Sequence, residues 1–350
     1  MGTIQSGRAG QLRVRWFRGW HTTLDEALAE LPEMPTCPHA LFRTLAQHPT
    51  VAAKRIALVT DREGPVAVLA LRRRRRHWEP VGELAVPEAV APVRPGMLLA
   101  ALVATGAYIR VPDFPGEVEA GGTIREVERF ETYHVRTDSD FDALWRELRN
   151  SDRVRKARNR CERLGDLSLE VDAPGAASWT IAAWERKWSR PYWDIRAAAA
   201  DMQVAAAYYT AHRRYHAFRL LHRGRPVAGT NWFADGDRLI AHCSYRDPAY
   251  DRFNVGVRLD ELFFRWSATS RYRVVDLGGE FDYKAKWGRP ARVHTNFAVI
   301  PRHVALARGA LAVWRRTWWL QPGPATEFLP AVRLVLPMAP WADLPPTSIG

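Results

Sequence analysis

Two distant segments of the chain follow the same pattern, and this internal repeat restricts the fold more than any other feature of the sequence. Residues 55–71 and 218–233 each comprise an apolar strand, a charged turn that contains glycine, and a second strand. In both segments the second strand opens with Pro-Val-Ala, at residues 65–67 and 226–228. Each segment predicts a β-hairpin, and helical stretches flank both hairpins. The repeat therefore predicts two related α/β halves, with a chance match of a short pattern as the alternative.

The size and charge of the chain support this expectation and suggest a partner. The 350 residues, 47% of them hydrophobic and 15 of them tryptophan, can form two packed domains. A formal net charge of +13 favours an anionic partner, such as nucleic acid, a nucleotide-like cofactor or a membrane surface. An arginine-rich composition also arises from coding bias, so the placement of the charges matters more than their sum.

The cysteines and the apolar runs indicate the compartment. The three cysteines, Cys37, Cys161 and Cys243, have unrelated spacings, which predicts reduced thiols and no metal site. The N-terminus has no continuous apolar region of a signal peptide. The longest apolar stretch, residues 96–107, is shorter than the roughly 20 residues that a spanning helix needs. We expect a cytoplasmic protein with no stable membrane insertion.

Hydrophobic periodicity divides the chain into three parts. We expect one domain at residues 1–150, a second and catalytic domain at 151–300, and a C-terminal segment at 301–350. That last segment comprises a helix that packs back against the first domain and a Pro-rich tail. The elements expected in the first domain are strands at 12–17, 55–60, 65–71, 78–84, 109–111 and 131–135 and helices at 23–31, 97–108 and 141–148. Those expected afterwards are helices at 152–164, 176–188, 202–215, 254–269 and 303–318 and strands at 166–171, 217–222, 226–233, 238–245, 272–275 and 294–300.

The helix expected near residues 152–164 is basic on one side. Its apolar stripe comprises Val154, Ala157, Cys161 and Leu164, and Gly165 ends it. Exposed helices usually carry both charge signs, whereas the other side of this helix is strongly positive. It either contacts the phosphates of an RNA or is a solvated face. The candidate RNA-binding residues are Arg153, Lys156, Arg160 and Arg163.

A second basic run lies at residues 72–76, where five arginines follow one another. On a strand their side chains would alternate between the two faces of the sheet, so the five cannot all contact one partner. The run is either a solvated strand end or an anion contact.

Residues 276–289 are the strongest candidate for a catalytic segment. An apolar strand ends there at Asp276, and Gly278 and Gly279 follow, which permits close backbone approach just past the strand. In α/β folds functional sites lie at such strand ends. Only five of the 51 basic residues are lysines, and two of those five, Lys284 and Lys286, occur in this segment. A solvated turn is the alternative.

An ordered set of motifs links these features to a known family. The set comprises the basic helix, a Trp-bearing helix, a three-strand meander ending in Tyr-Arg-Asp-Pro, a glycine loop that opens a helix, Val-Asp-Leu-Gly-Gly, and Tyr-Lys-x-Lys-Trp-Gly. This set resembles the Fem-like branch of the GNAT acyltransferase superfamily over nearly half the chain. The resemblance implies an α/β (α+β) fold of tandem GNAT-like domains, each a mixed, mostly antiparallel sheet flanked by helices.

The resemblance also implies an activity. Family members transfer an acyl or aminoacyl group to an amine, from an acyl-CoA or from an aminoacyl-tRNA, and a lysine in the last motif supports catalysis; Lys284 matches it. The GNAT pyrophosphate-binding loop falls here at residues 252–257, which contain one glycine, and the basic residue stands one place too far away. This departure weakens the expectation of a tightly bound CoA pyrophosphate.

The chemistry of amide formation assigns roles to further residues. The reaction needs a neutral amine, a stabilised oxyanion and a proton for the leaving group. We expect Lys284 to neutralise the developing negative charge, Asp276 or His242 to accept the amine proton, and Tyr245 to return one. No arrangement of Ser, Cys and His suggests a covalent intermediate. The candidate donor-binding residues are Asn254, Gly256, Arg258 and Gly278, and the candidate substrate pocket comprises Trp188, Tyr192, Trp193 and Tyr283.

Two donors and one non-enzymatic function are consistent with the sequence. The positive charge and the imperfect loop favour aminoacyl-tRNA as the donor substrate, with no covalently bound cofactor. Acyl-CoA is the alternative donor, because many GNAT enzymes use it. We expect the acceptor to be a small-molecule or peptide amine of secondary metabolism or cell-envelope synthesis. The other possibility is a nucleic-acid-binding protein whose catalytic site has decayed.

Overall fold

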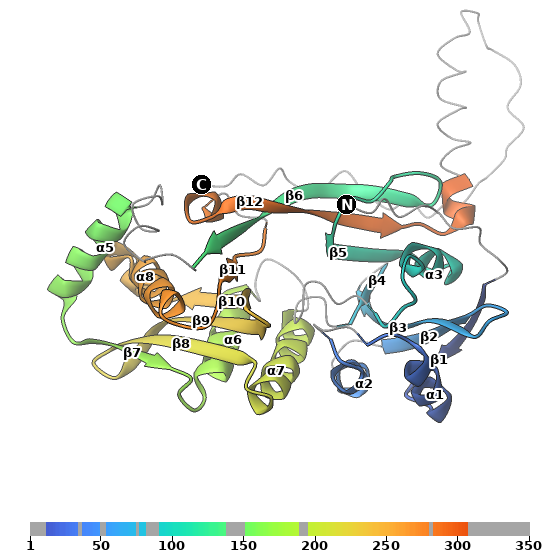
Figure 1. Ribbon diagram of the computed structural model, residues 1–350, viewed down its shortest axis with the longest axis horizontal. Helices are drawn as coiled ribbons and strands as arrows, with labels where there is room; N and C mark the ends of the chain where they lie inside the picture. Colours follow the sequence, from blue (N-terminus) through green and yellow to red (C-terminus); the bar gives the residue numbers. More distant parts are fainter. Residues whose placement is uncertain are drawn as a thin grey trace, which may run out of the picture. The chain divides into compact units, whose positions relative to one another are not determined.

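The computed structural model describes residues 12–33, 37–49, 54–74, 77–81, 91–137, 151–188, 195–279 and 283–306 (Figure 1). Their strands are β1 (Arg13–Phe17), β2 (Lys54–Thr60), β3 (Pro65–Arg74), β4 (His77–Pro80), β5 (Ile109–Pro115), β6 (Ile124–Arg136), β7 (Leu167–Val171), β8 (Tyr215–His222), β9 (Arg225–Asp235), β10 (Arg238–Arg246), β11 (Val274–Asp276) and β12 (Arg289–Val299). The helices are α1 (Thr22–Glu30), α2 (His39–Gln47), α3 (Leu98–Ala104), α5 (Ser151–Leu164), α6 (Ala176–Trp188), α7 (Ile195–Ala211) and α8 (Val255–Ala268), with 3₁₀ turns η1 (Pro248–Phe253) and η2 (Lys284–Lys286). All of them belong to one compact unit of residues 1–305.

The strands form one sheet in the order β1-β2-β3-β4-β5-β12-β6-β11-β10-β9-β8-β7. The strands pair in the same way from both edges of the sheet. From the β1 edge, three antiparallel pairs are followed by the parallel pair of β4 with β5. From the β7 edge, three antiparallel pairs are followed by the parallel pair of β10 with β11. The hairpins β2–β3 and β8–β9 therefore occupy equivalent positions, as the internal repeat predicts. The expected α/β fold, a mixed and mostly antiparallel sheet flanked by helices, is confirmed.

The two central strands are exchanged between the halves of the sheet. β6 follows β5 in the chain but pairs with β11, whereas β12 pairs with β5. β6 and β12 also pair with each other, antiparallel, along most of their length (Figure 1). A strand from residues 1–150 thus completes the sheet around β11. The division at residues 150 and 300 remains a prediction.

Helices cover both faces of the sheet. α5 and α8 pack on one face of the β7–β11 part, where Phe218, Trp232 and Phe263 form the centre of an apolar cluster. On the other face, a second cluster joins α1 and α2 to α7 and to Phe233 of β9. The halves of the sheet therefore share a hydrophobic core. A third cluster lies under α3.

The arginine run at residues 72–76 requires a correction. Arg72 is fully buried, and its Nη1 lies 2.7 Å from Oδ2 of Asp201, which is also fully buried, in α7. Arg74 is buried as well, with its Nε 2.7 Å from Oε2 of Glu79. Neither a solvated strand end nor an anion contact describes these two residues, because strand alternation turns both into the protein. Arg73 faces outward over the ring of Trp78, and residues 75 and 76 lie outside the described residues.

Most other elements lie close to where the sequence predicts them. The helix expected at 202–215 begins earlier, at Ile195, and ends at Ala211. The helix expected at 141–148, residues 307–318 of the last expected helix and the Pro-rich tail lie outside the described residues. The three cysteines are buried free thiols. In the described part of the chain, no helix combines the length and the apolar character that a bilayer crossing needs.

Candidate active site

The candidate catalytic segment begins where β11 ends, beside the exchanged strand β6. Asp276, the last residue of β11, is 4% exposed, and its Oδ1 accepts a hydrogen bond from the backbone N–H of Gly278. Its Oδ2 lies 3.0 Å from Nε2 of His134 in β6 and 3.5 Å from Nη1 of Arg238. Both carboxylate oxygens are therefore engaged.

These contacts determine the protonation state of Asp276. Burial alone would raise the pKa of its carboxyl, but His134, the N–H of Gly278 and Arg238 together outweigh burial, and the pKa is lowered. Asp276 is thus a carboxylate at neutral pH. A carboxyl with a low pKa and two engaged oxygens is poorly suited to take a proton from an amine.

Two positions of the segment require glycine, because atoms of β6 lie too close to them for a Cβ. A Cβ on Gly279 would lie 2.1 Å from the ring of Phe130, and one on Gly288 would lie 2.8 Å from the backbone oxygen of His134. Gly278 adopts a φ of +66°, which disfavours other residues. The glycines therefore let the loop lie against β6.

Lys284 folds back over this loop. Its Nζ donates a hydrogen bond of 2.7 Å to the backbone oxygen of Gly279, and a Cβ on Gly278 would lie 3.4 Å from that nitrogen. The side chain is half-buried, whereas Lys286, two residues later in η2, is exposed. Trp287 anchors the segment by packing on Phe264 of α8. The protein thus positions the Lys284 ammonium, and not that of Lys286, at the end of β11.

His242 and Tyr245 lie on β10, and their surroundings differ. Nδ1 of His242 lies 2.5 Å from the hydroxyl of Tyr215, and its ring contacts that of Phe233 in the core shared by the two halves. Tyr245 packs against Trp179 of α6, and burial is the main reason that its pKa is raised. These contacts place His242 at the shared core and Tyr245 beside α6, and the proton-transfer roles expected of both side chains remain predictions.

The candidate donor loop joins β10 to α8. The turn η1 ends at Asn254, whose φ of 57° and ψ of 42° are left-handed and lead into α8. A Cβ on Gly256 would lie 3.3 Å from Cδ of Arg246, so that arginine lies against the start of the helix. Arg258 points elsewhere, because its Nη1 lies 2.5 Å from Oε2 of the buried Glu261. It is therefore an internal ion-pair residue in this conformation.

The candidate substrate pocket is only partly described. Trp188 ends α6, and the ammonium of Lys187 lies 5.0 Å from the centre of its ring. Tyr283 is 43% exposed and directly precedes Lys284. Residues 192 and 193 lie outside the described residues.

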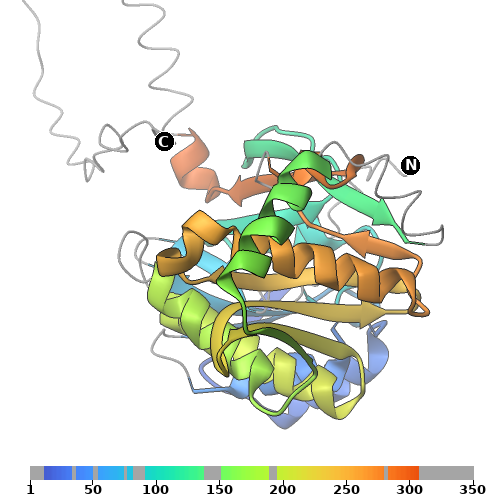
Figure 2. The ribbon, with the colours of Figure 1, turned by 90° about the vertical axis from the view of Figure 1, so that its left-hand side faces the viewer.

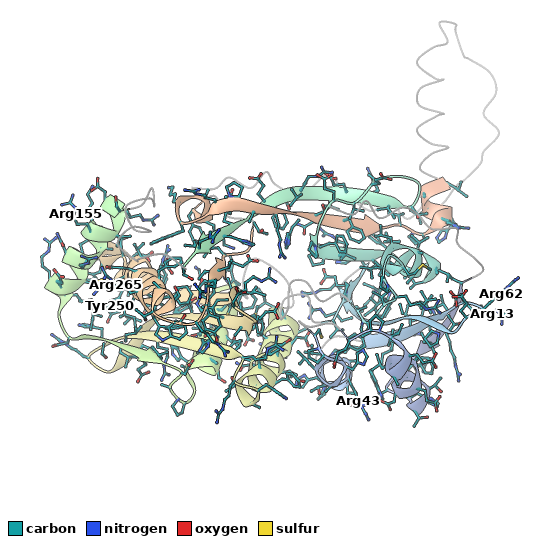
Figure 3. All side chains as sticks on the ribbon, viewed as in Figure 1. Arg13, Arg43, Arg62, Arg155, Tyr250 and Arg265 are labelled. Atoms are coloured by element: carbon teal, nitrogen blue, oxygen red, sulfur yellow. The ribbon has the colours of Figure 1, made fainter. Side chains whose placement is uncertain are left out.

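The basic helix α5 lies across α8, as Figure 2 shows. Val154, Ala157 and Cys161 are buried, as the apolar stripe predicts. Of the remaining basic residues, Arg158 pairs with Glu261, and Arg155 projects outward (Figure 3) and pairs with Asp152. All four candidate RNA-binding residues are exposed: Arg153, Lys156, Arg160 and Arg163.

One further residue near the site is not predicted by any sequence pattern. Asp260 of α8 is partly buried, and its charge interacts with Arg153 of α5, with Arg246 of β10 and with Tyr283. In the sequence it is one polar residue in an amphipathic helix, and no local pattern distinguishes it from its neighbour Glu261. Among the described residues no cluster of His, Cys, Asp and Glu has a geometry that would hold a metal ion.

The mixed sheet and its flanking helices place the chain among α/β proteins, in which functional sites commonly lie at strand ends. Residues 146–285 match the family model described as the acetyltransferase (GNAT) domain. This match covers less than half of the chain, and it supports an enzyme that acts as an acyltransferase. No curated protein matches the sequence.

Several solved structures resemble the chain. FemX has a TM-score of 0.46 and 11% identity, over 83% of this chain and 98% of that one. A tandem GNAT protein from the clavulanic acid biosynthesis pathway has a TM-score of 0.46 and 11% identity, over 82% and 98%. L-PGS from Bacillus licheniformis has a TM-score of 0.45 and 13% identity, over 81% and 93%.

Proposed function

We propose that this acyltransferase forms amide bonds by moving an aminoacyl group from aminoacyl-tRNA to the amine of a small molecule or peptide. The observation that carries the proposal is the exposed row of Arg153, Lys156, Arg160 and Arg163 on α5. This helix contacts η1 and α8, which form the candidate donor loop. Positive side chains in a row bind the phosphates of a nucleic acid backbone and are well suited to hold a tRNA beside that loop.

The reaction balances without a covalent enzyme intermediate. The amine nitrogen forms a bond to the carbonyl carbon of the aminoacyl ester, the bond from that carbon to the ribose oxygen breaks, and the oxygen gains a proton. Negative charge develops on the carbonyl oxygen in between. The Lys284 ammonium, held by its hydrogen bond to Gly279, supplies a fixed positive charge for that oxygen.

The remaining candidate residues have supporting roles in this proposal. Asp276 holds the loop through the N–H of Gly278, and Gly256 lets the side chain of Arg246 lie against the start of α8, where it can contact the donor. Tyr283, next to Lys284, contacts the substrate. The protein acts in the cytoplasm, and its products belong to secondary metabolism or the cell envelope.

Acyl-CoA is the second candidate donor. The family match of residues 146–285 favours it, because the matching family is that of acetyltransferases. The backbone N–H groups at the start of α8 are oriented as in sites that bind phosphate. In this alternative the donor contacts Gly256 and the basic face of α5 has no part in catalysis.

A labelling experiment separates the two donors. Total tRNA charged with radioactive amino acids, or radioactive acetyl-CoA, is incubated with the protein and the amine fraction of a cell extract. An aminoacyl ester is hydrolysed by mild base and an amide is not. Base-stable label from charged tRNA supports the proposal, and label from acetyl-CoA alone selects the alternative. Label from neither donor would remove both.

A further inference from the structure

The exchanged strand β6 brings a histidine to the end of β11. His134 of β6 is paired in the sheet with Asp276, the last residue of β11. Residues directly opposite each other in a ladder have their side chains on the same face of the sheet. Asp276 is also paired with Ile240 of β10, which belongs to the core shared by the two halves. The side chains of His134 and Asp276 therefore lie on the face of the sheet that holds this shared core.

His134 and Asp276 form a largely buried pair. Nε2 of His134 is buried and lies 3.0 Å from Oδ2 of Asp276. Burial would raise the pKa of the Asp276 carboxyl, but His134 is foremost among the groups that outweigh burial and lower it. A carboxylate oxygen accepts hydrogen bonds and donates none, so the hydrogen of a neutral imidazole at His134 belongs on Nε2. Nδ1 is then the nitrogen that has a lone pair for a proton.

The other side of this imidazole is open. The side chain of His134 is 19% exposed, and because Nε2 is buried, the exposed area belongs to its other atoms. Within the described parts of the chain, this side chain forms no hydrogen bond or ion pair besides its contact with Asp276. A histidine that a carboxylate fixes at one nitrogen, and that is open at the other, is an arrangement by which enzymes take up and return a proton.

The pair lies beside the ammonium group of Lys284. Oδ1 of Asp276 accepts a hydrogen bond of 2.9 Å from the N–H of Gly278. Nζ of Lys284 lies 3.4 Å from the position that a Cβ on Gly278 would take, and it donates to the backbone oxygen of Gly279. The carboxylate and the ammonium therefore contact the same glycine, and His134 adjoins the carboxylate. An amine at His134 and a carbonyl oxygen at Lys284 would belong to one reacting centre.

Charged groups from four elements surround the imidazole. Asp276 of β11 contacts it directly, and Nη1 of Arg238 in β10 lies 3.5 Å from the same carboxylate oxygen. Arg289 of β12 is the residue opposite His134 in the ladder, and Lys284 belongs to the loop after β11. Asp276 stabilises a protonated imidazole, whereas the three cations favour release of the proton. Both directions of a proton transfer are thus supported.

We propose that His134 takes the proton of the acceptor amine, a role that rests on the proposed function. As the amine nitrogen bonds to the donor carbonyl carbon, its proton moves to Nδ1 of His134, and the resulting imidazolium is paired with Asp276. The bond from that carbon to the leaving oxygen or sulfur then breaks, and the leaving atom takes the proton from Nδ1. The neutral imidazole is restored, and Lys284 remains protonated throughout.

The contacts favour His134 over the two side chains to which the sequence assigns this role. Both oxygens of Asp276 are occupied, one by the N–H of Gly278 and one by its ion pairs, and its pKa is lowered. Nδ1 of His242 lies 2.5 Å from the hydroxyl of Tyr215 in the core shared by the two halves. His134 joins an oriented imidazole to the loop that holds Lys284. No sequence pattern indicates it, because β6 and β11 are distant in the chain.

The test compares His134→Gln with His212→Gln, the same substitution at an exposed histidine after α7. The amide nitrogen of a glutamine can lie near Asp276 as Nε2 does, but an amide does not take up a proton. The donors are charged total tRNA and acetyl-CoA, the acceptor is the amine fraction of a cell extract, and base-stable label is measured against pH. At mildly alkaline pH His134→Gln should be slower than the wild type by about 100-fold or more, whereas His212→Gln should equal it.

The pH dependence separates a proton acceptor from a structural residue. The ratio of the wild-type rate to the His134→Gln rate should fall as the pH is lowered, because a protonated imidazole cannot accept a proton. Protonation of the acceptor amines slows both proteins alike and cancels from this ratio. A purely structural role of His134 predicts a ratio that does not change with pH.

A second measurement does not depend on the substrate. In protein labelled with ¹⁵N in its histidine rings, the ring signals of His134 are assigned through its own backbone amide, so no folded variant is needed. We expect the neutral ring to carry its hydrogen on Nε2, and Nδ1 to take up a proton reversibly as the pH is lowered. A ring that carries its hydrogen on Nδ1, or that stays protonated across the pH range of activity, overturns the inference.

The outcomes also distinguish this inference from the proposed function. An active wild type with an unchanged His134→Gln rate, or with a rate ratio that does not vary with pH, overturns the inference and leaves the proposed function standing. Transfer from neither donor would remove the proposed function itself, and the inference with it.

Discussion

At the scale of single residues, the position of one ammonium group distinguishes two neighbouring lysines. Lys284 is half-buried and bonded to Gly279, whereas Lys286 is exposed. We expect Lys284→Ala to reduce turnover at least about tenfold, because the substitution removes a positioned charge from the transition state. Lys286→Ala is the matched control and should behave as wild type. Turnover rates of the folded, purified variants test this prediction. Full activity of Lys284→Ala would remove this lysine from the mechanism.

A substitution at Gly288 tests the close approach of the candidate catalytic segment to β6. A Cβ there would lie 2.8 Å from the backbone oxygen of His134, which cannot move without disturbing the centre of the sheet. Gly288→Ala should therefore lower the free energy of unfolding by about 1–3 kcal/mol, as overpacking usually does. Gly121→Ala is the control, since a Cβ at that glycine meets nothing within 4 Å. Urea denaturation measures both, and equal stabilities would show that the loop is free to shift.

At the scale of elements, substitutions on α5 distinguish aminoacyl-tRNA from acyl-CoA as the donor. Lys156→Glu combined with Arg160→Glu should weaken tRNA binding and make the slope of log affinity against log salt shallower. The expected change in slope is roughly one unit for each phosphate that the variant no longer neutralises. Stability should change by no more than about 0.5 kcal/mol, because both side chains are exposed. Filter binding at several salt concentrations measures the slope.

A matched control excludes a general effect of net charge. Arg13→Glu with Arg62→Glu makes the same change of charge at the β1 end of the sheet, away from α5 (Figure 3). This variant should bind tRNA almost as the wild type does. If both double variants bind tRNA equally weakly, α5 is not the contact. If both bind it as tightly as the wild type, the tRNA donor is wrong and acyl-CoA remains.

Whether the sequence predicts an element depends on how far apart in the chain the residues that define it lie. The buried stripe of α5 follows from 3.6-residue periodicity, and both hairpins follow from a strand, turn and strand pattern within about 17 residues. The exchange of β6 and β12 has no local signal, because a strand pattern does not specify its partner. Arg72 likewise resembles a surface arginine until α7 brings Asp201 beside it from 129 residues away.

At the scale of the whole molecule, that buried pair joins the two halves of the sheet. Arg72 belongs to β3 and Asp201 to α7, and both side chains are about 1% exposed. Burial is the largest cause acting on Asp201 and raises its pKa, against the effect of Arg72 and Lys54. Removing either side chain of the pair should therefore be strongly destabilising, because the charge of the other one would remain buried.

A double-mutant cycle on this pair tests whether the halves fold as one unit. Arg72→Met should cost about 3–5 kcal/mol, because Asp201 then loses its ion pair with Arg72 and keeps the more distant contact with Lys54, at 3.9 Å. Arg72→Met with Asp201→Leu should recover most of that stability, since no buried charge from the pair remains. All variants should unfold in a single transition, because the cluster of α1, α2, α7 and Phe233 spans both halves. Fluorescence and circular dichroism should therefore give the same midpoint in urea. Two separated transitions would show that the halves unfold independently. A double variant as unstable as the single one would show that the buried charge of Asp201 is not what destabilises Arg72→Met.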